Sequence, residues 1–380
     1  MPIDFAASPR STLGIEWELA LVDRESRELA GIAPGILAEV ADRFPQSSFP
    51  HLAGELLENT VELVTAPHET VTGATADLRE LALAAQAAAE TRGAALIGSG
   101  SHPFSVWSDQ SATRSERYER FMDRYHWWGR NMLIWGVHVH VGVDKKERAV
   151  PLMNALLVYL PHLLALSSSS PLWAGEATGY SSNRTLMFQQ LPTAGLPWPV
   201  EDWADVERVL DDLSKTGIIA EPTEARWDIR PAPRWGTIEV RACDGASTLA
   251  EIGALAALTQ CLVEWLQQAV DRGEPLPVLQ PWFVRENKWR AARYGMEAEV
   301  IVDQAGRQIP LRDDLARLLP ELAPVADRLA CTEELAEVRR MMERGTSAER
   351  QLALFEARGG GDLALTAVVD SLISEFRGGL

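Results

Sequence analysis

The feature that most constrains this chain is a strict alternation of apolar and charged residues in several short segments. Ile15 and Trp17 alternate with Glu16 and Glu18. The same period of two recurs in four further segments, at residues 60–64, 133–143, 226–230 and 237–242. A period of two is that of a β-strand with one buried face and one open face. Because sheets of this kind are antiparallel, the pattern predicts an antiparallel sheet with one polar face.

Helical segments separate these strands. Helices are predicted at residues 74–92, 112–125, 151–167, 202–214, 249–272 and 284–294, and almost continuously from 311 to 376 with a break at Gly359–Gly361. No regular succession of βα units is present, which favours an α+β fold: a curved antiparallel sheet with helices packed outside it. We expect one domain over residues 1–380, with a mostly helical C-terminal portion from about residue 311.

The charge balance excludes some partners. The chain has 54 acidic and 36 basic residues, a net charge of −18, which argues against nucleic-acid binding and against attraction to anionic lipid. Its three cysteines are widely spaced, so neither a disulfide framework nor a zinc ribbon is indicated. The N-terminal segment does not resemble a secretory signal, and no apolar run reaches the roughly 18 residues of a membrane span. We therefore expect a cytoplasmic protein without a membrane partner.

The polar face of the predicted sheet is unusual in its residue types. It carries carboxylates, imidazoles and guanidiniums from five strands: Glu16 and Glu18, Glu62, His138 and His140, Asp228 and Arg230, Glu239 and Arg241. One such pair alone is typical of a solvated strand. Carboxylates from several strands on one face repel one another unless cations offset their charge. Oxygen-rich sites suit Mg²⁺ or Mn²⁺, so the pattern predicts a polyvalent cation site.

Basic residues near these strands indicate a phosphate. They are Arg184, Arg230, Arg234, Arg241, Arg285, Lys288 and Arg290. Carboxylates that hold metal ions, with arginines nearby, are what a phosphoryl-transfer site requires. The chain has no GxxxxGK[ST] loop and no GxGxxG motif after a strand, and Gly98–Pro103 is interpreted as a turn. Any nucleotide site is therefore expected to be of a non-P-loop kind.

An ordered series of motifs resembles the glutamate–cysteine ligase type 2 family, the bacterial carboxylate–amine ligases. The motifs span nearly the whole chain, at Gly14–Glu18, Glu55–His68, Gly98–Phe104, Gly136–Gly142, Arg184–Leu186, Pro192–Pro197, Trp227–Pro231, Gly236–Arg241 and Arg285–Ala291. The resemblance implies a fold similar to the catalytic sheet of glutamine synthetase and guanidino kinases, an antiparallel funnel with helices outside. It also implies ATP-dependent amide formation between a carboxylate such as glutamate and an amine such as cysteine. The implied intermediate is an acyl phosphate. The implied glutamate–cysteine ligase activity can be a weak one, with another acid and amine as the main substrates.

The resemblance also assigns roles to individual residues. The ligands that it implies for Mg²⁺ (or Mn²⁺) bound with ATP are Glu16, Glu18, Glu55, Glu62 and Glu239, with His138 beside the metal–phosphate cluster. The catalytic residues that the resemblance implies are Glu62 and Arg241, the latter by stabilising the transferring phosphoryl group. Arg184 is expected to hold a substrate carboxylate, and Arg285 and Lys288 to contact the nucleotide. The membership of His140 and Glu58 is left open, as is a pocket role for Trp127 and Trp128.

Two other functions stay open on the sequence. One is a zinc hydrolase that uses the His138/His140 pair, although this needs further histidine ligands. The other is an inactive family member that acts as a binding protein. A homodimer is expected from the frequency of such assemblies.

Overall fold

A seven-stranded sheet lies at the centre of the computed structural model, which describes residues 3–380. Its strands are β1 (Leu13–Asp23), β2 (His51–Gly54), β3 (Thr60–Val64), β4 (Ala94–Ile97), β5 (Gly136–Gly142), β10 (Ile229–Ala232) and β11 (Thr237–Asp244). Their order is β10-β11-β5-β1-β3-β2, with β4 also paired to β1, and every pairing is antiparallel. The predicted antiparallel α+β architecture is confirmed.

The register gives the sheet one apolar and one polar face, as the alternation predicts. Trp17 on β1 lies between Leu63 on β3 and Val137 on β5, and all three side chains are buried. One residue along, Glu18 lies opposite Glu62 on the other face. A shift of one residue would exchange the two faces, so burial of the apolar set fixes the register.

The sheet is strongly curved. Strands β2 and β10 form its opposite edges, yet Phe49 just before β2 contacts Trp235 just before β11, with ring centroids 5.8 Å apart. The two edges therefore approach each other at one end of the sheet, and the polar face becomes the inside of a funnel.

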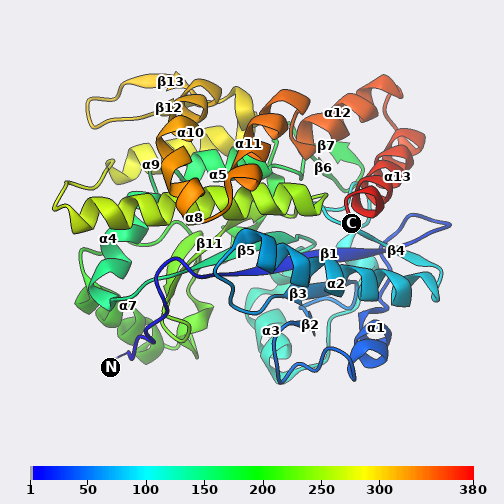
Figure 1. Cartoon of the computed structure of the whole chain (residues 1–380). Coiled ribbons are helices and arrows are strands. Elements are labelled where there is room, and N and C mark those ends of the chain that lie inside the picture. Colours follow the sequence, from blue (N-terminus) through cyan, green and yellow to red (C-terminus); the bar gives the residue numbers. More distant parts are fainter. Residues whose placement is uncertain (1–2) are drawn as a thin grey trace.

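Helices surround the sheet. They are α1 (Ala33–Val40), α2 (Val71–Glu90), α3 (Glu116–Arg130), α4 (Lys146–Leu156), α5 (Leu160–Ser167), α6 (Asn183–Phe188), α7 (Trp203–Lys215), α8 (Leu249–Asp271), α9 (Pro281–Tyr294), α10 (Leu311–Arg328), α11 (Thr332–Arg344), α12 (Ser347–Ala357) and α13 (Asp362–Gly378). Most of these helices pack on the apolar side of the sheet, whereas α3 and α6 line a cavity on its polar side. In Figure 1, α8 lies between the sheet and the orange C-terminal helices α10 and α11. Helix α8 is long and apolar enough to cross a membrane, but 89% of its most apolar stretch is buried inside the protein.

Short strand pairs lie outside the main sheet. They are β6 (Leu172–Trp173) with β7 (Glu176–Ala177), β8 (Ala194–Gly195) with β9 (Arg226–Trp227), and β12 (Glu299–Ile301) with β13 (Gln308–Pro310). The predicted strand at 226–230 is therefore divided between β9 and β10. Asp228 lies at this division: its carbonyl oxygen accepts a hydrogen bond from the Arg241 backbone N–H, which continues the register with β11, and its buried carboxylate accepts a hydrogen bond from Lys288.

The predicted helix at 151–167 is also wrong in its continuity. It is two helices, α4 and α5, bent by 64°. Pro161 lies in the first turn of α5, where the missing N–H of proline costs nothing, so a new helix begins there.

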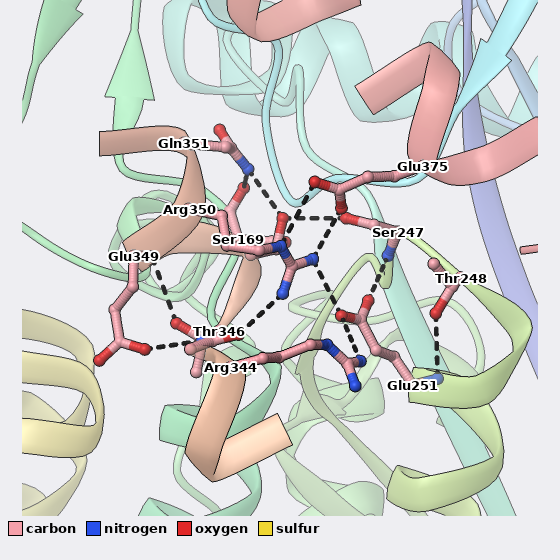
Figure 2. Close-up of polar contacts among 12 residues, drawn as sticks. Ser169, Ser247, Thr248, Glu251, Arg344, Thr346, Glu349, Arg350, Gln351 and Glu375 are labelled. Atoms are coloured by element: carbon pink, nitrogen blue, oxygen red, sulfur yellow. Dashed lines mark hydrogen bonds and ion pairs between the residues drawn. The ribbon is translucent and has the colours of Figure 1, made fainter. Parts of the chain in front are cut away.

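A buried ion-pair network attaches the C-terminal helices to α8 (Figure 2). Glu251 of α8 is 2% exposed and accepts hydrogen bonds from Arg350 at 2.9 Å and from Arg344 at 3.2 Å. Arg350 also reaches Glu375 of α13 at 2.7 Å. Because a buried carboxylate without these partners would be strongly destabilising, the network fixes how α11, α12 and α13 dock.

Candidate active site

The inside of the funnel collects the predicted metal ligands. Three groups each place one ligand atom per residue within 4.8 Å of the others: Glu16, Glu62 and His138; Glu16, His140 and Glu239; Glu18, Glu55 and Glu62. The strands β1, β3, β5 and β11 supply every member except Glu55, which follows β2. Curvature of the sheet thus brings together residues that lie more than 200 positions apart in the chain.

Two histidines contact Glu16 from the neighbouring strand. His138 Nδ1 lies 2.7 Å from Glu16 Oε2, and His140 Nε2 lies 3.4 Å from Glu16 Oε1. Burial alone would raise the pKa of Glu16, but hydrogen bonds to these imidazoles hold it well below its ordinary value. His140, whose membership the sequence left open, therefore belongs to the cluster, whereas Glu58 lies beside Gly31 and outside it.

The surroundings of His138 favour its neutral imidazole form. Burial and the nearby Arg241 lower its pKa to about 4. Its short contact to Glu16 assigns the proton to Nδ1, so Nε2, which lies 3.9 Å from Glu18 Oε1, keeps its lone pair. An imidazole oriented by a carboxylate in this way is a suitable metal ligand.

Glu62 is the most informative carboxylate of the cluster. Within residues 3–380 its side chain makes no hydrogen bond or ion pair with any positively charged group. Burial and the charges of Glu16, Glu55 and Glu18 raise its pKa well above the ordinary value. Burial and Glu55 likewise raise the pKa of Glu18 to about 7. Carboxylates that repel one another, with Glu62 among them lacking a donor in the described chain, fit a bound Mg²⁺ or Mn²⁺.

The donor set favours oxygen-preferring cations over zinc. Each of the three groups contains two or three carboxylates and at most one imidazole. Catalytic zinc sites usually take their ligands mainly from histidine, whereas Mg²⁺ and Mn²⁺ prefer carboxylates. The geometry therefore does not gather the further histidines that a zinc hydrolase would need.

Two arginines share the carboxylate of Glu239, which is 1% exposed. Arg230 Nε donates to Glu239 Oε2 at 2.7 Å, and Arg241 Nη1 donates to Glu239 Oε1. Burial would raise the pKa of Glu239, but the charges of Arg230 and Arg241 hold it far below its ordinary value. Arg241 Nε has no hydrogen-bond partner among the described residues. Arg241 is thus fixed by Glu239 through Nη1 and keeps further donors, Nε among them, for an anion.

A cavity of about 580 Å³ opens from one end of the cluster. Glu18, Glu55, His138 and Arg241 line its inner part. Helix α3 forms an outer wall, to which it contributes Tyr118, Phe121 and Tyr125. Helix α3 is held in place partly by the Tyr118 hydroxyl, which donates to Glu55 Oε2 at 3.3 Å. The cavity has the size of a site for small organic molecules.

Two further arginines line this cavity without a carboxylate partner in the described chain. Arg184 is 3% exposed, its Nε has no hydrogen-bond partner, and its Nη1 reaches only the carbonyl oxygen of Arg241 at 3.3 Å. Arg226 of β9 contacts Phe121 and donates to the Thr193 hydroxyl, and burial lowers its pKa. Buried guanidiniums that are not held in an ion pair favour an anionic ligand.

The structure does not bring every predicted residue to the cluster. Lys288 Nζ donates to Asp228 at 2.6 Å, and Lys288 and Arg285 line a separate cavity beside Trp282 and Pro192. Their contact with a nucleotide stays a prediction. The two tryptophans of α3, Trp127 and Trp128, are 52% and 39% exposed and are absent from the lining of the cavity described above.

Comparison with known proteins identifies relatives along the whole chain. A model of the family described as "Glutamate-cysteine ligase family 2 (GCS2)" matches residues 12–367. A protein of Leifsonia xyli subsp. xyli is 53% identical over 378 residues, which cover 100% of this chain and 99% of that protein. A protein of Clavibacter sepedonicus is 54% identical over 382 residues, with coverage of 100% and 98%. Both are named "Putative glutamate--cysteine ligase 2".

Solved structures share the fold at low sequence identity. The glutamate–cysteine ligase of Francisella tularensis, in complex with AMP, has a TM-score of 0.72 at 16% identity and covers 98% of this chain and 90% of its own. A bifunctional glutathione synthetase from Pasteurella multocida has a TM-score of 0.64 at 15% identity, with coverage of 97% and 52%. The curved sheet with its outer helices is therefore an arrangement that ligases of this kind share.

Proposed function

Since this chain belongs to glutamate-cysteine ligase family 2, whose members are ATP-dependent ligases that form carbon–nitrogen bonds, we propose that it joins a carboxylate to an amine through an acyl phosphate. Glutamate and cysteine are the first pair to test, including for a weak activity. The single observation that carries the proposal is the juxtaposition inside the funnel. Within the described residues, Glu62 of the carboxylate cluster has no hydrogen-bond donor, and Arg184 of the adjoining cavity forms no ion pair.

The proposed chemistry proceeds in two steps. An oxygen of the substrate carboxylate forms a bond to the γ-phosphorus of ATP while the bond from that phosphorus to ADP breaks. The amine nitrogen then attacks the acyl carbon, inorganic phosphate leaves with the electron pair of the broken bond, and the nitrogen loses a proton. Activation is needed because a carboxylate is a poor electrophile, and phosphate supplies the leaving group.

The residues of the chain have separate tasks in this scheme. The carboxylates of the cluster, with His138, would hold Mg²⁺, which when bound neutralises phosphate charge. Arg241, fixed by Glu239, stabilises negative charge on the transferring phosphoryl group through its remaining donors. Arg184 holds the substrate carboxylate in the cavity, and Arg226 binds a second anionic group of the acid or amine.

The two ends of the funnel suggest where each substrate enters. The cavity with Arg184 lies at the end that carries Glu18 and Glu55. Glu239 of the cluster lies opposite His140 in the sheet. Trp235 lies four residues before Glu239, so their Cα atoms are at most about 13 Å apart. Trp235 and Phe49, each 43% exposed, therefore form an aromatic lip at the opposite end. We assign the nucleotide to this end, with its base on the lip, because aromatic rings stack on bases.

The decisive experiment replaces Glu62 with glutamine. Release of ADP is measured with MgATP, L-glutamate and L-cysteine, then with a panel of acid and amine pairs, and the amide product is detected by mass. Glu62→Gln is expected to abolish ADP release, because the amide cannot replace an anionic ligand, while the thermal unfolding temperature in EDTA does not fall. The matched control is Glu58→Gln, four residues earlier and outside the cluster, which is expected to turn over normally.

Several results would contradict the proposal. Turnover of Glu62→Gln at the wild-type rate would overturn the role of the cluster. Absence of ADP release by the wild type with every pair would favour a binding protein without turnover. Stoichiometric zinc in the purified protein, with hydrolysis in place of amide formation, would favour the hydrolase.

A further inference from the structure

A buried acid outside the metal cluster has no part in the scheme above. Asp244, the last residue of β11, is 0% exposed. Its Oδ2 accepts hydrogen bonds from the Ser169 backbone N–H at 3.0 Å and from the Ser170 hydroxyl at 2.7 Å. Its Oδ1 accepts a hydrogen bond from the Ser182 hydroxyl at 2.8 Å. Such a carboxylate is costly to bury, so its complete set of donors calls for an explanation.

A β-bulge gives Asp244 this position. The pairing of β11 with β5 shifts between Val240 and Cys243, so that Cys243 lies opposite Val137 and Asp244 lies opposite Gly136. Without the shift, Cys243 would share the face of Arg241. The bulge thus sends Cys243 to the apolar face and places Asp244 at the level of Gly136, next to the cavity.

Two of the serines that bind Asp244 also hold the start of α6. The Ser182 hydroxyl is the N-cap of α6 and accepts from the Thr185 backbone N–H at 3.5 Å. The Ser170 hydroxyl accepts from the Arg184 backbone N–H at 2.9 Å. Each hydroxyl therefore donates to Asp244 and accepts from the first turn of α6, the turn from which Arg184 projects. Asp244 is the common acceptor that orients both hydroxyls.

The guanidinium of Arg184 lies against β5 at the residue opposite Asp244. A Cβ atom built on Gly136 would come within 2.1 Å of Arg184 Nη2, so only glycine leaves room for it there. In this position Arg184 Nε has no partner in the part of the chain that the structure describes, and the side chain lines the cavity. Small movements of α6 would therefore displace the guanidinium directly.

The C-terminal helices hold the other side of the same serine loop. Gln351 of α12 donates to the Ser169 carbonyl oxygen at 2.9 Å (Figure 2). The Ser169 hydroxyl donates to Gly245, and Gly100 donates its backbone N–H to that hydroxyl, both at 2.7 Å. The loop is thus fixed from behind, and Asp244 transmits this fixed position to α6.

We propose that Asp244 is a positioning residue for Arg184: it holds the first turn of α6 so that the guanidinium faces the cavity with donors free for the carboxylate of the acid substrate. The inference rests on the proposed function for the identity of that ligand. It adds a residue that makes no contact with substrate and acts through Arg184.

The kinetic test uses Asp244→Asn with MgATP, L-cysteine and L-glutamate as the acid. Asparagine keeps the shape, but its amide nitrogen cannot accept a hydrogen bond, so one or two of the three bonds are lost. The KM for L-glutamate is expected to rise about tenfold, because a tenfold change corresponds to the free energy of one hydrogen bond to a charged group. The KM for ATP is expected to stay within about twofold. Ser101→Ala, which removes another buried hydroxyl that donates to Leu172, is the matched control and is expected to change neither KM.

A double-mutant cycle separates positioning from general stability. In an Arg184→Gln background, Asp244→Asn is expected to have less than about a twofold further effect on the KM for L-glutamate, because its route of action is already removed. Equal losses for ATP and L-glutamate, or full multiplication of the two single effects, would overturn the inference. If Asp244→Asn does not fold, Ser182→Ala keeps the carboxylate and is expected to give the same selective change at a smaller size; no change there would also overturn it.

A structural readout is independent of turnover. Crystal structures of the wild type and of Asp244→Asn are expected to show that the Arg184 guanidinium leaves its place over Gly136 in the variant. An unmoved guanidinium would overturn the positioning role even if the enzyme is active. A moved guanidinium in a protein that turns over no acid and amine pair would retain the positioning role and reject only the proposed function.

Discussion

Replacing Glu18 with glutamine should make the metal-free protein more stable while impairing the site. In the folded protein, burial and the charge of Glu55 raise the pKa of Glu18 to about 7 from an ordinary 4.5. The ionised carboxylate is therefore unfavourable in its folded surroundings when no cation is bound. Glutamine has the same shape without the charge, and its oxygen can still accept the hydrogen bond that the Gly136 backbone N–H donates to Glu18 at 2.5 Å.

The size of the effect follows from the two pKa values. A difference between about 7 and 4.5, at about 1.4 kcal/mol per pH unit, corresponds to about 3 kcal/mol. Because the folded pKa is the raised one, the folded state has no penalty from Glu18 below pH 4.5. It loses stability as the pH rises from 4.5 to about 7. For a chain of 380 residues, about 3 kcal/mol shifts the unfolding temperature by about 4 °C.

Thermal unfolding in EDTA tests this reasoning. At about pH 8, Glu18→Gln is expected to unfold about 4 °C above the wild type, and at about pH 5 the two should nearly coincide. Added MgCl₂ should raise the unfolding temperature of the wild type more than that of Glu18→Gln, because a bound cation offsets carboxylate repulsion and the variant has lost one carboxylate. The control Glu58→Gln should follow the wild type in every condition.

The outcome that refutes the reasoning is simple. If Glu18→Gln is as stable as the wild type, or less stable, at about pH 8 in EDTA, repulsion among the cluster carboxylates does not destabilise the folded protein. The carboxylates would then need no cation to offset their charges.

Two further predictions concern the nucleotide and the C-terminal helices. Trp235→Ala is expected to raise the KM for ATP about tenfold, since a stacked base contributes about 1–3 kcal/mol, while Trp235→Phe keeps a KM near that of the wild type. Steady-state kinetics with varied ATP measure both values. An unchanged KM in Trp235→Ala would show that the base does not bind at the aromatic lip. Glu251→Ala leaves Arg344 and Arg350 without their buried carboxylate and is expected to lower the free energy of unfolding by about 3–5 kcal/mol. Differential scanning fluorimetry should show a fall in the unfolding temperature of about 5 °C. A fall smaller than that of Glu58→Gln would contradict this prediction.

Much of the cluster could be predicted because its signal is local. Alternation along β1 already places Glu16 and Glu18 on one face, and the same holds for His138 and His140. The motif resemblance added Glu55, which no alternation marks, and the structure places it with Glu18 and Glu62. A homodimer, a single domain and a cytoplasmic location have no such local signature and stay predictions.

Other features could not be predicted because they depend on contacts distant in the chain. Arg226 and Tyr118 were missed: one lies in a two-residue strand and the other on a helix, and only the packing of α3 over the funnel brings both to one cavity. Lys288 occurs in a motif rich in charged residues, yet its buried partner Asp228 is 60 positions away. Ion pairing of this kind leaves no periodic trace in a sequence.

By itself, the sequence determined which side chains share a face, because the direction of a side chain along a strand is set by its immediate neighbours. It also determined, through its ordered motifs, the family of the fold. Only the tertiary structure decided which strands are adjacent and how far the sheet curls, and therefore how close the carboxylates lie. The tertiary structure also determined the bulge in β11, because a register shift exists only with respect to the neighbouring strand. The bulge interrupts the local alternation and places Asp244 opposite Gly136.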